Sequence, residues 1–223
     1  MPFTNVLDQS IVTHAFGGAA WTADSAYYVA LSTTTPTQAK GSGAPWSFTE
    51  PSAQTALTSA LASGTAYTSL AVQPLSSAVA SGDSIKVTTG SNTQTFTASA
   101  AATAGATSIS VTSLVANAAY AVGSLVQDIT KGGGYSRVKV TNNATDFVAA
   151  TPQPATGYGV TNGAAITFGS PTGSWGTVTY FGLFSATGGG TLVAYGALTT
   201  AKAVGAGDTA PSFAIHALTI ANS

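Results

Sequence analysis

The sequence contains no cysteine and very little charge. Without cysteine, neither disulfides nor thiolate metal sites are available. Six basic and seven acidic residues make up only 6 % of the 223 residues, against about a quarter in typical soluble domains. Because surface charge keeps monomers apart, we expect this protein to bury much of its surface in an assembly. The alternative is a surface of small polar residues that stays soluble through its hydroxyl groups.

The few charges exclude several classes of partner. The net charge is −1, and the basic residues are scattered apart from Arg137 and Lys139. Nucleic acid is therefore not expected as a partner, because phosphate contacts need clustered Lys and Arg. No apolar run approaches the length of a bilayer span, so no membrane partner is expected either. The first residues lack the basic region and apolar core of a signal peptide, which predicts a protein made and assembled inside a cell.

Catalytic patterns are missing as well. The two histidines, His14 and His216, lie at opposite ends of the chain, and no Gly-x-Ser-x-Gly motif accompanies them. We expect His216 to lie on a strand, on the same face as Leu218 and Ile220, as a core or interface residue. No two acidic residues lie close in sequence, although spacing does not exclude a carboxylate pair formed in space. The sequence therefore predicts no enzyme, no cofactor and no metal site.

The pattern of apolar residues predicts an all-β protein with one short helix. Thr4 or Asn5 can cap this helix, and Gly17 with Gly18 can end it. Its apolar stripe at i+4 spacing consists of Phe3, Leu7, Ile11 and Ala15. A loop rich in Gly, Pro and Ser is predicted over residues 37–52. Strands are predicted over residues 26–32, 135–140, 146–150, 164–168, 175–184, 191–198 and 213–220. Six or seven strands are enough for a jelly roll or β-sandwich.

Residues 53–131 differ in composition from their flanks and contain a weak internal duplication. Ser69–Leu75 is similar to Ser108–Leu114, and an Ala-rich stretch and a Gly-containing turn follow each copy. A strand, a turn and a strand, repeated once, predict a small β-barrel or Greek-key-like module, with a hairpin between the copies. The competing interpretation is a flexible linker rich in Ala, Ser and Thr, as residues 98–105 alone would suggest.

Five aromatic residues are candidate interface anchors, because Trp and Tyr are enriched in binding hot spots. They are Trp21, Trp46, Trp175, Tyr180 and Phe181. A position in the core of a sandwich explains them equally well. Alternation along 175–184 places Trp175 and Phe181 on one face and Tyr180 and Phe184 on the other. A strand with aromatic residues on both faces is buried on both sides, which makes a partner subunit a candidate for the second cover.

Several phrases of the sequence resemble a family of small virion structural proteins of tailed bacteriophages. The family is often labelled as tail-fibre or structural protein. The phrases are Tyr28–Thr33, Gly132–Val140, Thr161–Phe168, Ser174–Phe184, Tyr195–Thr200 and Gly207–Thr209. In such relatives the equivalent of Thr49–Ser52 runs straight into Gly-Gly-Gly-Tyr. The resemblance therefore implies a discontinuous β-sandwich domain, 1–52 and 132–223, into which a small β domain, 53–131, is inserted.

Removing the insertion brings Glu50 and Arg137 near each other. We therefore expect an ion pair across the neck of the insertion, where it would fix strand register or an intersubunit contact. The alternative is two exposed charges that contribute less than ~1 kcal/mol. The Gly132–Gly134 run precedes a strand, whereas phosphate-binding loops precede a helix, so a flexible or close-packed start of the strand is expected there.

The resemblance implies a non-enzymatic virion protein assembled in the cytoplasm of the bacterial host. Its small size and low charge favour a capsid decoration (cement) protein, a homotrimer that binds the major capsid protein or other virion proteins. The alternative is a short tail fibre, spike or tail-tip component involved in adsorption to the host. A carbohydrate-binding or depolymerising receptor protein is a third interpretation, which the scarcity of carboxylates disfavours.

Overall fold

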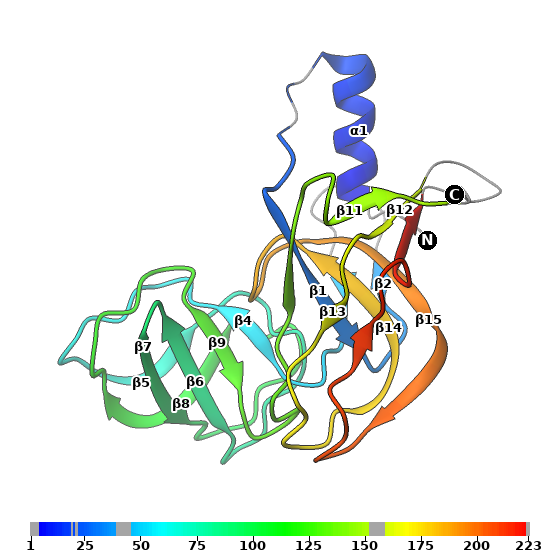
Figure 1. Ribbon diagram of the computed structural model, residues 1–223. Helices are drawn as coiled ribbons and strands as arrows, with labels where there is room; N and C mark the ends of the chain where they lie inside the picture. The colour runs from blue at the N-terminus through cyan, green and yellow to red at the C-terminus, as the bar shows by residue number, and fades with distance from the viewer. Residues whose placement is uncertain (1–4, 19, 21, 39–45, 152–158, 222–223) are drawn as a thin grey trace.

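The computed structural model describes residues 5–18, 20, 22–38, 46–151 and 159–221. Apart from one helix, the regular structure is antiparallel β, which confirms the predicted all-β fold class (Figure 1). The elements are α1 (Asn5–Gly17), β1 (Ala26–Ser32), β2 (Thr37–Gln38), β3 (Trp46–Ser47), β4 (Gln54–Ala56), β5 (Ala66–Ala71), β6 (Ser84–Thr89), β7 (Asn92–Thr97), β8 (Ser108–Val115), β9 (Leu125–Asp128), β10 (Val138–Thr141), β11 (Phe147–Ala149), β12 (Gly159–Asn162), β13 (Ile166–Thr167), β14 (Gly176–Phe184), β15 (Leu192–Val204), β16 (Ser212–Phe213) and β17 (Thr219–Ala221). Among the described residues, none of the sheets closes into a barrel.

The largest sheet of the flanking segments has the order β10-β1-β14-β15. Its strand β1 has the bounds that the sequence predicts, and pairs with β10 on one side and β14 on the other. One face of this sheet packs against the small sheets β11-β12-β17 and β13-β16. Alternating residues of β1 and β14, such as Val29, Leu31, Phe181 and Leu183, fill the core between them. The arrangement is a sandwich with one large sheet and a fragmented second layer.

Helix α1 stands away from the sheets at the top of the view in Figure 1. It ends where the sequence predicts, because Gly18 adopts a positive φ of 65° that closes the helix. Its inward side chains, Leu7 and Ile11, lie over an apolar cavity of about 460 Å³ that Tyr27, Phe147 and residues of β15 line. The base of α1 is therefore attached to the sandwich by apolar contacts.

Residues 53–131 fold as two small sheets, β4-β9-β6-β7 and β5-β8, with a hydrophobic cluster of their own. The two copies of the predicted duplication are related by a local two-fold: β5 pairs with β8, and β6 pairs with β9. The backbone hydrogen bonds repeat this symmetry. Leu61 and Tyr120 exchange a pair of N–H···O bonds, and Val79 exchanges the same pair with Ala102. The segment is thus folded rather than a linker, while its status as a separate domain remains a prediction.

The C-terminal strands differ from the prediction in three places. No strand is predicted where β12 lies. Strand β15 is longer than predicted, and between Ala197 and Lys202 it bulges away from its register with β14. The predicted strand 213–220 is split into β16 and β17 by a turn. The prediction for His216 is wrong, because this residue lies exposed in that turn with a φ of 62°. Its Nδ1 lies 3.0 Å from the hydroxyl of Thr161. The turn contains no Gly and interrupts a run of apolar residues, so the sequence gives no signal that the strand breaks there.

Candidate functional site

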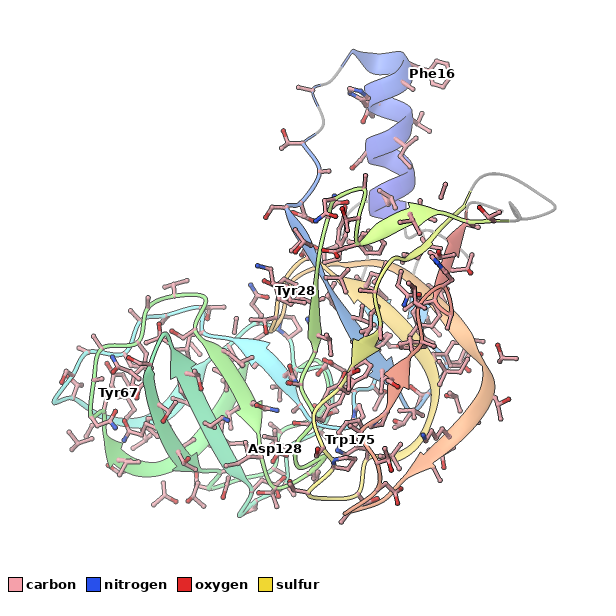
Figure 2. All side chains as sticks on the ribbon, viewed as in Figure 1. Phe16, Tyr28, Tyr67, Asp128 and Trp175 are labelled. Carbon is pink, nitrogen blue, oxygen red and sulfur yellow. The ribbon has the colours of Figure 1, made fainter. Side chains whose placement is uncertain are left out.

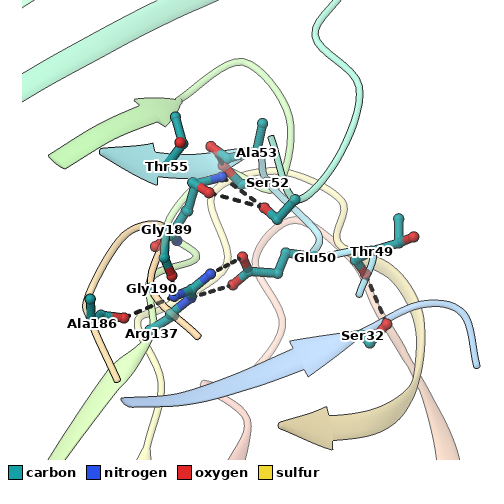
Figure 3. Close-up of polar contacts among 12 residues, drawn as sticks. Ser32, Thr49, Glu50, Ser52, Ala53, Thr55, Arg137, Ala186, Gly189 and Gly190 are labelled. Carbon is teal, nitrogen blue, oxygen red and sulfur yellow. Dashed lines mark hydrogen bonds and ion pairs between the residues drawn. The ribbon is translucent and has the colours of Figure 1, made fainter. Parts of the chain in front are cut away.

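A buried ion pair joins the two flanking segments next to residues 53–131 (Figure 3). Arg137 precedes β10 and donates from Nε to Glu50 Oε1 at 3.0 Å and from Nη2 to Glu50 Oε2 at 2.8 Å. Neither side chain is exposed. The two parallel hydrogen bonds form the bidentate geometry that makes Arg–carboxylate pairs strong. The structure thus contains the ion pair that the sequence suggests, and places it in the interior rather than on the surface.

The guanidinium of Arg137 also binds the loop between β14 and β15. Its Nη1 donates to the carbonyl oxygens of Ala186 at 2.8 Å and Gly189 at 2.7 Å. Its Cζ lies 3.7 Å from the centre of the Phe184 ring, a close cation–π contact. Three separate parts of the chain therefore meet on one side chain. A buried charge needs such a set of partners, because burying an unpaired charge costs much free energy.

Tyr135 completes this polar network on the side of β1. Its hydroxyl donates to Glu50 Oε1 at 2.8 Å and accepts from the Leu31 N–H at 3.0 Å. Burial, followed by the charge of Glu50, raises the pKa of Tyr135 well above its ordinary value, so the phenol stays neutral. We refer to Glu50, Tyr135 and Arg137 as the neck triad.

Polar contacts tie residues 53–131 to the neck triad. The amide nitrogens of Gln54 and Gln127 both donate to the carbonyl of Tyr135. On the other side, the Gly190 N–H donates to Gln73 Oε1 at 2.8 Å. The Ser52 hydroxyl donates to the carbonyl of Asp128, which closes the base of the segment. The neck is therefore closed by hydrogen bonds from both sides of residues 53–131.

Close packing explains the Gly132–Gly134 run. Gly134 has a φ of 81°, and an added Cβ would lie 2.0 Å from the carbonyl oxygen of Ser170. The carbonyl of Gly133 accepts a hydrogen bond from Trp175 Nε1 at 2.9 Å. Glycine is needed here for the backbone conformation and for the close approach. Of the two expected starts of the strand, flexible or close-packed, the close-packed one is present.

The aromatic candidates fall into different environments. Trp175 and Phe181 are buried in the sandwich core, where Trp175 makes an edge contact with Tyr135 at 5.2 Å. Tyr180 is half-buried, and its hydroxyl lies 3.4 Å from the hydroxyl of Thr35. Trp21 lies outside the described residues, and so does the side chain of Trp46. Whether any of them contacts a partner remains a prediction.

The opposite face of β14 carries Tyr180 and Phe184, as predicted, but its cover near Phe184 comes from the chain itself. Phe184 is fully buried and makes an edge contact with Phe48 at 5.1 Å. Leu192 packs in the same cluster. The expectation that a partner subunit covers this position is therefore wrong. Sequence alternation shows that both faces are covered, but it does not show that a loop 136 residues away supplies the cover.

The sequence analysis missed the outer surface of α1. Val12 is 55 % exposed and Phe16 89 % exposed, at i+4 spacing on the helix, with Phe16 at its far end (Figure 2). The i+4 spacing of Val12 and Phe16 is visible in the sequence, but the predicted apolar stripe through Leu7 and Ile11 contains more residues. A second missed feature is the pair of acidic residues Asp83 and Asp128, which interact although they lie 45 residues apart.

The described part of the chain has neither a candidate metal site nor a helix that could span a membrane. There, no group of three or more His, Cys, Asp or Glu side chains could hold a metal ion. The one helix in those ranges, α1, is neither long nor apolar enough to cross a membrane.

The fold and the neck triad define an all-β protein whose buried polar groups hold its parts together. Residues 111–221 match the model of a family described as podophage GP4 fiber I protein gp80. The match begins within β8, ends in β17 and spans just under half of the chain. No curated protein matches the chain. The family match supports a phage virion structural or fibre protein, and thus a location in the virion.

Proposed function

We propose that the chain is a non-enzymatic component of a fibre of a tailed bacteriophage. The observation that carries this proposal is the fibre-family match over residues 111–221. The matched region contains Tyr135, Arg137 and Trp175, whose contacts hold the sandwich together. A fibre component must transmit force between its neighbours without unfolding, and a saturated interior network suits that role.

The surface that we propose for assembly is the outer face of α1. An isolated helix shorter than ~12–15 residues is marginal in water, so a 13-residue helix needs packing along its length. Leu7 and Ile11 line the apolar cavity between the helix and the sandwich, and Ile11 is still 40 % exposed. Toward the free end, Val12 and Phe16 stay exposed, and burial of a side chain such as Phe16 contributes about 1.5–3 kcal/mol.

We propose the α1 helices of further copies of this chain as the occupant of that face. Asp8 is the one charged residue in the helix sequence, so copies brought together through α1 meet little like-charge repulsion. Apolar helices with i+4 pairs pack well against one another. The homotrimer expected from the sequence is the assembly that we propose.

Light scattering coupled to size-exclusion chromatography tests this surface. We expect the full chain to be oligomeric, and the double variant Val12→Ser/Phe16→Ser to be monomeric with an unchanged sandwich. Ile215→Ser is the matched control, because Ile215 is 55 % exposed but far from α1 in sequence, in the turn between β16 and β17. A monomeric wild type, or an oligomer that survives the double substitution, contradicts the role of α1.

Copy number in purified particles tests the fibre assignment itself. A handful of copies per virion, located at the tail, is expected for a fibre component. A capsid decoration protein is the second candidate, favoured by the compact chain, which shows no long shaft among its described residues. Hundreds of copies on the capsid would establish that candidate and overturn the fibre proposal.

A further inference from the structure

We propose that Asp83 and Asp128 form a proton-binding pair that makes the stability of the junction at the base of residues 53–131 depend on pH. The inference does not depend on where in the virion the protein lies. It rests on two carboxyl groups that share one buried place, and on an oxygen atom there that lacks a donor.

The two carboxyl groups come from adjacent strands. Asp83 lies one residue before β6, and Asp128 is the last residue of β9, in register with Ile85 of β6. Asp83 is 6 % exposed and Asp128 only 1 % exposed. Both acids are therefore almost completely removed from water and interact with each other. Asp128 lies near the boundary between the segment and the sandwich (Figure 2).

One oxygen atom of each acid has donors, whereas the second oxygen atom of Asp128 is buried without one among the described residues. Asp83 Oδ2 accepts from the Ala80 N–H at 2.6 Å and lies 3.1 Å from Lys131 Nζ. Asp128 Oδ1 accepts from the N–H groups of Thr130 at 2.8 Å and Lys131 at 3.3 Å. Asp128 Oδ2 is buried, and within the described ranges no donor reaches it. A buried acceptor without a donor costs free energy, and a proton bound at this oxygen removes that cost.

A proton on Asp128 also resolves the repulsion between the two acids. A protonated Asp128 donates to the carboxylate of Asp83, so the pair carries one negative charge, which Lys131 balances. Burial, and then the charge of Asp83, raises the pKa of Asp128 to about 6. At Asp83 burial acts in the same direction, but the Ala80 N–H and the Lys131 ammonium outweigh it and lower the pKa. The proton therefore belongs to Asp128.

The observations favour a proton over a metal ion. The ammonium of Lys131 already occupies the cationic position beside Asp83 and donates to the carbonyl of Ala78 at 3.3 Å. No third acidic or histidine ligand joins the pair in the described part of the chain. Ca²⁺ takes about six to eight oxygen ligands, more than two carboxylates provide.

The position of Asp128 connects its proton to the junction. Its N–H donates to the carbonyl of Ala53 at 2.9 Å, and its carbonyl accepts from the hydroxyl of Ser52. Its neighbour Gln127 donates to Tyr135 of the neck triad. When Asp128 loses its proton, repulsion from Asp83 acts on the residues that close the base of the segment. The junction then opens more often while the two cores stay folded.

The sign of the pH dependence follows from the raised pKa. The carboxyl binds its proton more tightly in the closed junction than in the open one, where the ordinary value of 3.8 applies. The stabilising effect is complete below pH ~4 and is lost as the pH rises through about 6. Between these limits the opening equilibrium increases by up to about 100-fold, since each unit of pKa difference is a factor of ten.

Two measurements on the full chain test the proposal. In an NMR titration with ¹³C-labelled aspartate, we expect the Cγ signal of Asp128 to titrate near pH 6. In hydrogen exchange, corrected for the intrinsic pH dependence, we expect amides near 128–131 to lose protection between pH 4 and 7. Asp128→Asn should abolish this loss. Asp208→Asn is the matched control, since Asp208 also accepts from a backbone N–H, at 2.7 Å, but is exposed.

Three results would overturn the inference. One is an Asp128 signal that titrates at the ordinary pKa of an aspartic acid. Another is a hydrogen-exchange profile that keeps its pH dependence in Asp128→Asn. The third is a shift of the Asp128 signal on addition of Ca²⁺ or Mg²⁺ at neutral pH, which would identify a cation site instead. If Asp128→Asn does not fold, Asp83→Asn replaces it, and the Asp128 signal should then titrate at lower pH.

Discussion

Glu50 Oε2 and Arg137 Nη2 lie 2.8 Å apart in the interior, although 87 residues separate the two in the sequence. The folded segment 53–131 begins just after Glu50 and ends just before Arg137, so the chain runs past this ion pair both where it enters the segment and where it leaves it. Tyr135 adds a third partner. In a chain with so few charges, this pair marks the place where the two flanking segments meet.

Arg137→Met is expected to lower the free energy of unfolding by about 3–5 kcal/mol, because it leaves Glu50 buried without its counter-charge. Urea unfolding followed by circular dichroism measures the loss. Lys139→Met provides the control. Lys139 is exposed two residues further along, and its replacement should change the stability by less than about 0.5 kcal/mol.

The double variant Glu50→Leu/Arg137→Met distinguishes the net contribution of the ion pair to stability from the cost of leaving one of its charges unpaired. Replacing both charges by apolar groups should cost less than Arg137→Met alone, since no unpaired charge remains. A double-mutant cycle across the four proteins gives the coupling. Additive losses would show that the two residues do not act together.

Much of this architecture could be predicted from the sequence, because it rests on local signals. The bounds of β1 follow from its β-branched and aromatic residues, and the end of α1 follows from Gly18. Glu50 and Arg137 could be paired because scarce charges leave few alternatives. The internal duplication could be seen because its two copies keep similar residues in the same order.

The features that escaped prediction depend on contacts between distant segments. Phe48 reaches the face of Phe184, and nothing in either local sequence specifies that cover. Asp83 and Asp128 meet because β6 and β9 pair, a register that periodicity does not reveal. The prediction for His216 is wrong because it extends the alternation of a strand through residues that form a turn. Sequence patterns indicate which residues are buried, whereas tertiary packing decides which residues they pack against.

Gly134→Ala is expected to be much more destabilising than Gly123→Ala. Both glycines have a positive φ, 81° and 87°, so an alanine costs about 1–2 kcal/mol at either. Only at Gly134 would the new Cβ also meet the carbonyl oxygen of Ser170, at 2.0 Å, which should add about 1–3 kcal/mol. Thermal unfolding of the two variants measures the difference, and equal losses would contradict the close approach.

Leu70→Ala and Ile109→Ala should have similar effects, because the local two-fold pairs these residues with each other. Both are buried in the core of residues 53–131, and each substitution should cost about 2–5 kcal/mol. Ser110→Ala on the exposed side of β8 is the control, with an expected change within about 0.5 kcal/mol. Chemical denaturation measures all three. Negligible losses at both core positions would support the linker interpretation.

Removal of residues 53–131, with Ser52 joined directly to Gly132, should leave a folded sandwich. Gly132 already packs against Pro51, where an added Cβ would lie 2.6 Å from the carbonyl oxygen of Pro51, so the new bond spans a short gap. The shortened chain loses the amide donors of Gln54 and Gln127, and water replaces them at the exposed Tyr135 carbonyl.

We expect a single cooperative thermal transition with a lower midpoint than that of the full chain. Arg137→Met in this background should again cost about 3–5 kcal/mol, because Glu50, Tyr135 and the Gly189 carbonyl remain in place. A shortened chain that aggregates or lacks fixed tertiary structure by near-ultraviolet circular dichroism would contradict the two-domain prediction. Residues 53–131 would then be an integral part of one fold, and the neck triad a part of its single core.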